Sequence, residues 1–272
     1  MATSPAGGAE NSLEIPASWV PVLDTLEARV RRVVDGDLGQ LPGLAPAEVP
    51  ASLRELQEAL PLDDVDLSIM IIAAAAAMSV EIGLLLTTFG GDPDATGPTV
   101  DTVMMLTGLQ PLSGEDRARF DESSTMCVLG LIELGPSSRG LLRRTVVMPE
   151  PVVRFLLGHW EPDARVRRAL LLPDRDALPE ELLPQVVIPE RLPVVLRARA
   201  GTAAIDFVRR WSVSIIGQEP TIFDAALLPT DIEAHHVALR ACARDAAMLG
   251  TVLVIDYSAA RSRWRQSPPW RE

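Results

Sequence analysis

The chain has 272 residues, a hydrophobic content of 47% and a formal net charge of -12, so it is long enough to bury the cores of about two domains. Its basic residues are all arginine, and the absence of lysine excludes Schiff-base chemistry, a lysine general base and a phosphate-loop lysine. The acidic charge disfavours general binding to nucleic acid, and two cysteines, Cys127 and Cys242, do not support a disulfide framework.

The first fifty residues predict a tail, a helix and a loop. Residues 1–17 are mostly small and polar, with no basic start and no apolar run, which predicts a disordered tail rather than a signal peptide. Apolar residues recur at helical spacing through residues 18–34, which predicts an amphipathic helix. Residues 36–50 contain three prolines and three glycines and predict a loop.

Residues 52–158 predict a helical module. A short helix at 52–60 ends at Pro61, Asp63 or Asp64 caps a second helix that runs to about residue 89, and a third helix covers residues 99–107. A further helix start at Ser113 leads into residues 117–122. The most apolar stretch, residues 67–80, contains five consecutive alanines and is too short to cross a bilayer, so it predicts a buried helix.

A β-hairpin is predicted after these helices. Residues 126–134 and 141–148 flank a turn at 135–140, and a helix at 151–157 follows, ended by Gly158. Helices followed by a hairpin and a final helix predict a winged-helix arrangement. Clustered arginines in this region form either a solvated face or, alternatively, a surface for nucleic acid: Arg139, Arg143, Arg144, Arg154, Arg165, Arg167 and Arg168.

Three short motifs of this module also carry a family resemblance. They are LPLDDVDL at residues 60–67, PTVD at residues 98–101 and PVVRFLLG at residues 151–158. In their order and spacing they resemble the N-terminal winged-helix variant domain of bacterial AAA+ ATPases of the cell-division-cycle-like, single-ring type. The resemblance implies a long buried helix, a Pro-Thr-Val helix start and a last helix before an ATPase core. It also implies a role in remodelling protein assemblies, and some members accompany contractile injection systems.

A proline-rich segment separates this module from the C-terminal part. Residues 161–168 predict a charged helix, and residues 171–192 predict a linker with recurring prolines. Residues 193–257 predict an α/β domain, with strands at 194–196 and 251–256 and helices at 203–211 and 231–249. The predicted fold class is therefore α+β followed by α/β: a mostly helical winged-helix-like domain at 18–170, then a truncated P-loop-NTPase-like domain with a short parallel sheet, and a tail at 258–272.

The resemblance implies a phosphate-binding loop between the strand at 194–196 and the helix at 203–211. Such a loop needs two glycines separated by four residues, then lysine, then serine or threonine, because backbone, amine and hydroxyl together hold the phosphates and magnesium. On this frame the glycines fall on Ala198 and Ala203, the lysine on Ala204 and the hydroxyl on Ile205, while Gly201 is an accessory position. The sequence therefore predicts a degenerate site.

The strand at 251–256 ends at Asp256 and resembles a Walker B strand, whose carboxylate holds magnesium through water. The glutamate that follows in the family and polarises the attacking water is replaced here by Tyr257. Asp256 is either a retained metal-associated acid or a carboxylate that caps the end of a strand. Arg197 and Arg199 leave open an alternative in which the loop binds ATP and Mg without lysine.

Other patterns for chemistry are weak. His235 and His236 are neighbours on a helix, where side chains point about 100° apart, so they do not share a metal and are predicted to be exposed or at the edge of the core. Cys127 and Cys242 lie in apolar helical surroundings and are predicted to be buried thiols. The sequence therefore gives no support for an independent enzyme activity.

These observations predict a non-catalytic AAA+-ATPase-like protein that acts as a protein-interaction or regulatory module in the cytoplasm. Its expected partner is another protein, such as an AAA+ relative or that relative's client assembly, and neither nucleic acid nor membrane is expected. No cofactor is expected, and the remnant of the nucleotide site comprises Gly201, Ala204 and Asp256. Three alternatives are an ATP-binding and Mg-binding family member that uses arginine in place of lysine, a winged-helix DNA binder, and a nonfunctional remnant.

Overall fold

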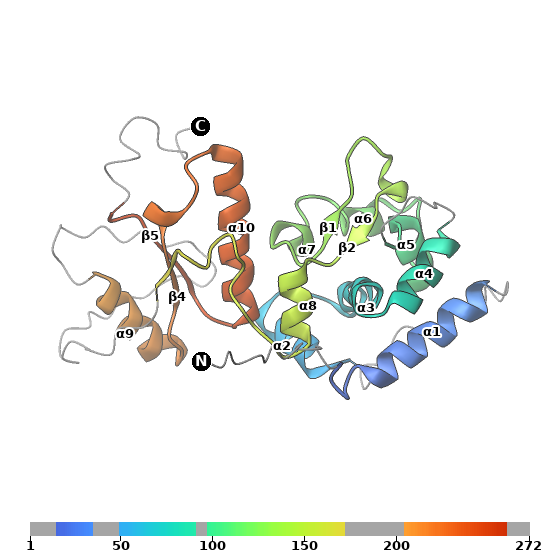
Figure 1. The fold of residues 1–272 in the computed structure, drawn as a ribbon, viewed down its shortest axis with the longest axis horizontal. Helices are drawn as coiled ribbons and strands as arrows, with labels where there is room; N and C mark the ends of the chain where they lie inside the picture. The colour runs from blue at the N-terminus through green and yellow to red at the C-terminus, as the bar shows by residue number, and fades with distance from the viewer. Residues whose placement is uncertain (1–14, 35–48, 91–96, 172–203, 260–272) are drawn as a thin grey trace, which may run out of the picture. The chain divides into compact units, whose positions relative to one another are not determined.

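The computed structural model describes residues 15–34, 49–90, 97–171 and 204–259, and its elements are labelled in Figure 1. The chain forms two compact units. The first contains residues 1–54, 63–121 and 132–161, and the second contains residues 55–62, 122–131 and 162–272. Outside the described residues lie 1–14 of the tail predicted at 1–17, most of the loop at 36–50, 172–192 of the linker, the strand at 194–196, and 260–272 of the tail predicted at 258–272.

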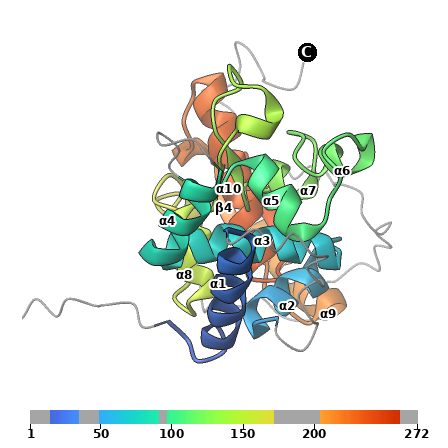
Figure 2. The same ribbon diagram turned by 90° about the vertical axis from the view of Figure 1, so that its right-hand side faces the viewer.

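The first helix, α1 (Val20–Val34), confirms the amphipathic helix predicted from residues 18–34. Its apolar stripe is buried, and the helix packs against α4, near which it lies in Figures 1 and 2. Trp19, just before the helix, is fully buried and donates its indole N–H to the carbonyl oxygen of Leu156 at 3.1 Å. The helix is therefore an integral layer of the first unit.

The long helix predicted to run to residue 89 is in fact two helices. The short helix predicted at 52–60 is α2 (Ala51–Ala59). The divided helix consists of α3 (Asp64–Met78) and α4 (Val80–Phe89), and these two meet at an angle of 117°. Ser79 has an extended backbone, and its hydroxyl accepts the N–H of Ile82, so it ends α3 and caps α4. The alanine run has no residue that disfavours helix, which is why periodicity alone missed the break.

The predicted start of α3 is confirmed at Asp63. Its carboxylate accepts the N–H groups of Val65 and Asp66, and Asp66 accepts the N–H of Asp63, which completes a reciprocal cap. The guanidinium of Arg119 binds both carboxylates at 2.7–2.8 Å. Burial alone would raise the pKa of Asp63, but these hydrogen bonds and the charge of Arg119 hold it below its ordinary value.

Three shorter helices follow, each capped by a hydroxyl. They are α5 (Val100–Thr107), α6 (Gly114–Ala118) and α7 (Thr125–Val128), with caps at Thr99, Ser113 and Ser124. The helix predicted through residue 122 ends earlier, at Ala118, and residues 126–128 belong to α7 rather than to a strand. The apolar character that suggested a strand instead buries Met126 and Cys127 on this single turn.

The predicted hairpin is present but much shorter than expected. Its strands are β1 (Glu133–Leu134) and β2 (Val146–Val147), which pair antiparallel, and residues Leu141–Arg143 form the 3-10 helix η2. Thr145, just before β2, also makes an antiparallel bridge with Thr99. The segment at 145–147 therefore lies between Thr99 and β1, which is the small sheet that a winged-helix arrangement requires.

Helix α8 (Glu150–Leu156) closes the first unit, with Gly158 at φ +83° after it. The buried helix α3 lies at the centre and packs against α4, α5, α8 and β2. Among the described residues no single helix is both long and apolar enough to cross a bilayer, and the pair α3 and α4 reaches that length only across its sharp bend.

The second unit is a small α/β arrangement. It contains β3 (Leu170–Leu171), α9 (Ala204–Ile216), β4 (Thr221–Asp224), the 3-10 helix η4 (Ala225–Leu227), α10 (Ile232–Met248) and β5 (Leu253–Asp256). The strand order is β3-β4-β5, in which β3 is antiparallel to β4 and β4 is parallel to β5. Figure 1 labels β4 and β5. The sequence predicted β5, α9 and α10, but it missed β3 and β4.

Residues 161–168, predicted to be a charged helix, form turns instead. The carboxylate of Asp163 accepts the backbone N–H of Arg165, a local bond that favours a turn over a helix. These turns lead into β3, and the core of the second unit includes Val166 and Ala169 beside Phe223 and Cys242. Both cysteines of the chain are buried free thiols, as predicted.

Candidate functional site

Of the three positions of the predicted nucleotide remnant, the described residues include two, Ala204 and Asp256. Gly201 lies outside them, so its place in the fold is not described. Ala204 is the first residue of α9, where its methyl group provides neither charge nor hydrogen bond. Asp256 is the last residue of β5. Only the helix and one strand of the predicted site can therefore be located.

The carboxylate of Asp256 is held by the residue that follows the strand. Its two oxygens accept the backbone N–H and the hydroxyl of Ser258, at 2.8 and 2.9 Å. Asp224, its register partner at the end of β4, likewise accepts the N–H of Ala226 at 2.8 Å. Both aspartates lie at the carboxyl edge of the parallel pair, and both have the local bonds of carboxylates that cap a strand end.

Tyr257, at the position where a catalytic acid was expected, contacts helix α10 through its hydroxyl. Its hydroxyl lies 3.5 Å from Nε2 of His235, while Nδ1 of His235 lies 3.0 Å from the carbonyl oxygen of Pro229. Burial raises the pKa of Tyr257, which keeps the phenol protonated. His235 is 1% exposed, so the prediction of an exposed or edge histidine is wrong for it, whereas its neighbour His236 is exposed.

No group of three or more histidine, cysteine, aspartate or glutamate side chains is arranged for a metal in the described part of the chain. Cys242 is fully buried, and burial together with the charge of Asp245 raises the pKa of its thiol to about 12. A thiol with so high a pKa is a poor nucleophile near neutral pH.

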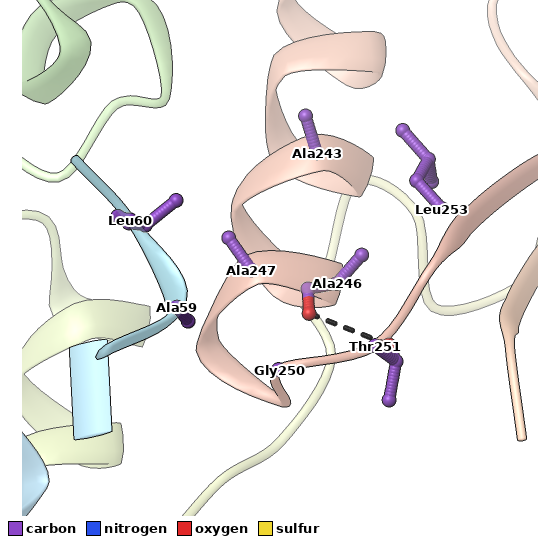
Figure 3. Close-up of a pocket in the computed structure, with 8 residues that line it drawn as sticks. All are labelled: Ala59, Leu60, Ala243, Ala246, Ala247, Gly250, Thr251 and Leu253. Carbon is purple, nitrogen blue, oxygen red and sulfur yellow. Dashed lines mark hydrogen bonds between the residues drawn. The ribbon is translucent and has the colours of Figure 1, made fainter. Parts of the chain in front are cut away.

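The second unit also has a small open hollow of about 260 Å³. Figure 3 shows the end of α2 on one side and α10 with the start of β5 on the other. The lining is almost entirely apolar and mostly small: Ala59, Leu60, Ala243, Ala246, Ala247, Gly250, Thr251 and Leu253. Few polar groups converge on this hollow, so it lacks the chemistry of a nucleotide or substrate site.

The wing and the helices before it are the remaining candidate surface. In a helix-turn-helix the second helix enters the major groove of DNA. Here that position, just before β1, is held by α7, a single turn without a basic residue. Arg144 at the base of the wing donates to the carbonyl oxygen of Gly135 at 2.7 Å, and Arg143 and Arg139 are exposed near its tip.

A buried ionic cluster in the second unit was not found by sequence reasoning. Asp163, Arg244 and Asp245 are 4%, 2% and 0% exposed, and Arg244 binds the carboxylate of Asp163. Asp163 was assigned to a helix that does not exist, and Arg244 and Asp245 lie on α10 within an otherwise regular pattern. The signal that could have indicated this cluster is the pair of adjacent charged residues, Arg244 and Asp245, among the small apolar residues of α10.

Comparison with known proteins supports one part of this description. Residues 43–170 match the family model described as "Winged helix domain, variant". No curated protein and no solved structure matches the chain. The chain therefore contains a winged-helix domain variant, as the sequence predicted, while the AAA+ likeness of residues 193–257 is still a prediction.

Proposed function

We propose that this chain is a non-catalytic protein-interaction or regulatory module, and that its winged-helix domain carries the surface for the partner. The proposal keeps the AAA+-like origin of the C-terminal part as an expectation from its sequence motifs. The partner it expects is another protein, with an AAA+ relative or that relative's client as candidates.

The observation that carries the proposal is the pairing of arginines in the first unit. Arg31 binds Glu27 and Glu81, Arg119 binds Asp63 and Asp66, and Arg154 binds Glu150 and Glu161. Arg117 and Arg144 donate to the carbonyl oxygens of Pro111 and Gly135. Arginines held in this way have less charge to offer to a phosphate backbone, which disfavours DNA as the partner.

An exposed apolar side chain on a hydrogen-bonded loop supports a protein partner. Leu112, between α5 and α6, is 98% exposed. Its loop is fixed by three bonds: the N–H of Ser113 to the carbonyl of Gln110, the N–H of Gln110 to Asp116, and Arg117 to the carbonyl of Pro111. A fixed loop loses little conformational freedom on binding, which favours Leu112 as an anchor in a partner's apolar pocket.

DNA binding is the second candidate, because winged-helix domains are compatible with it and Arg139 and Arg143 are exposed on the wing. The features against it are the single turn of α7 and the acidic side chains around it, including the exposed Asp121 and Glu122. These carboxylates would repel a phosphate backbone at the position where a recognition helix should enter the groove.

ATP binding through arginine is the third candidate. Asp256 already binds Ser258 through both oxygens, and Tyr257 stands where an acid would polarise water, which argues against hydrolysis. Arg197 and Arg199 lie outside the described residues and leave simple binding open to experiment.

One preparation of the full chain separates the three candidates. We expect no saturable heat on titration with Mg-ATP and no change in anisotropy of a labelled 30-base-pair duplex at low salt. Micromolar ATP binding would establish the nucleotide candidate. Duplex binding that weakens steeply with added salt, and that is lost in the R139A/R143A double variant, would establish the DNA candidate instead.

A further inference from the structure

The buried cluster of Asp163, Arg244 and Asp245 joins two parts of the second unit that are distant in sequence. Asp163 and Gly130 lie inside the residues that match the winged-helix model, whereas Arg244 and Asp245 belong to α10, outside that match. The cluster is thus one of the places where the C-terminal part contacts segments of the winged-helix sequence, together with the pairing of β3 and β4.

The contacts of the cluster are specific. Arg244 donates Nη2–H to Oδ2 of Asp163 at 2.5 Å and Nη1–H to the carbonyl oxygen of Gly130 at 3.4 Å. The backbone N–H of Asp163 donates to Oδ2 of Asp245 at 2.8 Å. Arg165 covers the outer side of Asp163 with its guanidinium at 2.9–3.2 Å. One guanidinium is therefore shared between a carboxylate and a carbonyl, and a second carboxylate holds the turn.

Asp245 is the member of the cluster whose buried charge has the fewest hydrogen bonds. It is 0% exposed, and its Oδ1 has no hydrogen-bond partner among the described residues. The nearest donor, Nε of Arg244, lies 3.7 Å away and likewise has no partner there. A buried carboxylate with one unsatisfied oxygen carries a desolvation cost that protonation removes.

The charges that face Asp245 come from both elements packed around it. Asp163 and Arg165 lie on the turn segment, Arg244 and Cys242 lie on α10, and the Gly130 turn contributes only backbone. Burial is the largest influence and raises the pKa of Asp245 to about 6, and the charge of Asp163 acts in the same direction. The bond from the Asp163 N–H and the charges of Arg244 and Arg165 oppose this rise.

We propose that the Asp163–Arg244–Asp245 cluster is a proton-sensitive latch, which holds α10 on the Asp163 turn and the Gly130 turn more firmly in weak acid than above neutral pH. The sign follows from linkage, because the folded form of Asp245 binds a proton more tightly than the unfolded form does. The stabilisation from this site is therefore fully present below the unfolded pKa, and it is lost progressively as the pH rises from that value through the folded pKa.

Amide hydrogen exchange on the full chain tests the latch. For a carboxyl whose pKa moves from 3.8 to about 6, the equilibrium constant for opening rises about tenfold between pH 5 and pH 7. We expect the amide exchange of peptides covering residues 122–131 and 162–170 to show this rise in the opening constant, after correction for the intrinsic exchange rate at each pH. Asp245→Asn should abolish it, because the amide does not titrate and its oxygen still accepts the Asp163 N–H. Glu233→Gln, an exposed acid on the same helix, should leave it unchanged.

Direct titration of Asp245 keeps the proposal testable if a variant fails to fold. In the wild-type chain the side-chain carboxyl ¹³C signal of Asp245 should titrate with a midpoint near pH 6. A midpoint near pH 4, or an exchange profile with the same pH dependence in Asp245→Asn as in the wild type, would overturn the latch.

Discussion

At the scale of single residues, this chain positions its elements with side chains that bond to nearby backbone. Asp63, Ser79, Thr99 and Ser113 each cap a helix, and Asp224 and Asp256 fold back on the residues after their strands. The helix starts at Asp63 and Thr99 could be predicted because each precedes an apolar periodic run, and the start at Ser113 because acidic residues follow it in the first turn. The cap at Ser79 could not, because it interrupts such a run.

Gly130 is a residue whose backbone favours glycine and whose surroundings leave little room for a side chain. Its φ is +63°, and a Cβ there would lie 3.3 Å from Cδ of Arg240 and 3.6 Å from Nη1 of Arg244. Gly108 has a similar φ of +76° but nothing within 4 Å. We expect Gly108→Ala to lower the free energy of unfolding by about 1 kcal/mol from backbone strain alone.

Gly130→Ala should cost more than Gly108→Ala, because the methyl group would also lie 3.3 Å from Cδ of Arg240, whose side chain must then shift by a few tenths of an ångström. Urea unfolding of both variants measures the difference. Equal losses in the two variants would show that the contact between Gly130 and α10 contributes nothing to stability.

The contact of Arg119 with Asp63 makes a prediction about acid stability. A pKa held below its ordinary value stabilises the fold above pH 3.8, and that stabilisation is lost as the pH falls through the folded value. Since Asp63 is half exposed, we expect the effect to be at most about 1 kcal/mol. The free energy of unfolding, measured with urea, should therefore fall less steeply from pH 6 to pH 3 in Arg119→Met than in the wild type. Equal pH dependence in the two proteins would contradict this account.

At the scale of elements, periodicity was sufficient for the long amphipathic helices and insufficient for the shortest strands. The long runs of α1 and α10 and the start of α3 were predictable because their apolar spacing extends over several turns. Strands β1, β2 and β3 have two residues each, which is too short for any alternation to appear. Strand β4 (Thr221–Asp224) lies beside a proline and was missed, whereas β5 (Leu253–Asp256), of the same length, was predicted from its unbroken apolar run.

Helix α1 lies outside the residues matched by the winged-helix model, yet its stripe is buried in the first unit. We expect Trp19→Ala to lower the free energy of unfolding by about 3–5 kcal/mol, since a fully buried indole and its bond to Leu156 are both lost. Trp19→Phe should cost less, because it keeps most of the packing. Chemical denaturation compares the two, and a loss below about 1 kcal/mol for Trp19→Ala would show that α1 is dispensable to the unit.

At the scale of the whole molecule, the candidate site was only partly predictable. The sequence predicted the winged-helix domain, and it predicted that the nucleotide remnant lacks lysine and the catalytic acid. It could not predict that Arg244 and Asp163, 81 positions apart, would meet in the core, because long-range pairing leaves no local pattern. It also could not predict that Leu112 would be left almost fully exposed.

The proposed function requires that the winged-helix domain binds a protein through Leu112, the exposed side chain on the loop between α5 and α6. The most direct test is quantitative mass spectrometry of proteins that co-purify with the tagged full chain from its native host. We predict a co-purifying protein whose recovered amount falls at least about tenfold with Leu112→Asp, because a charge in an apolar pocket costs several kcal/mol. The R139A/R143A variant should retain this protein. Loss of the co-purifying protein with the arginine variant, and its retention with Leu112→Asp, would contradict the claim.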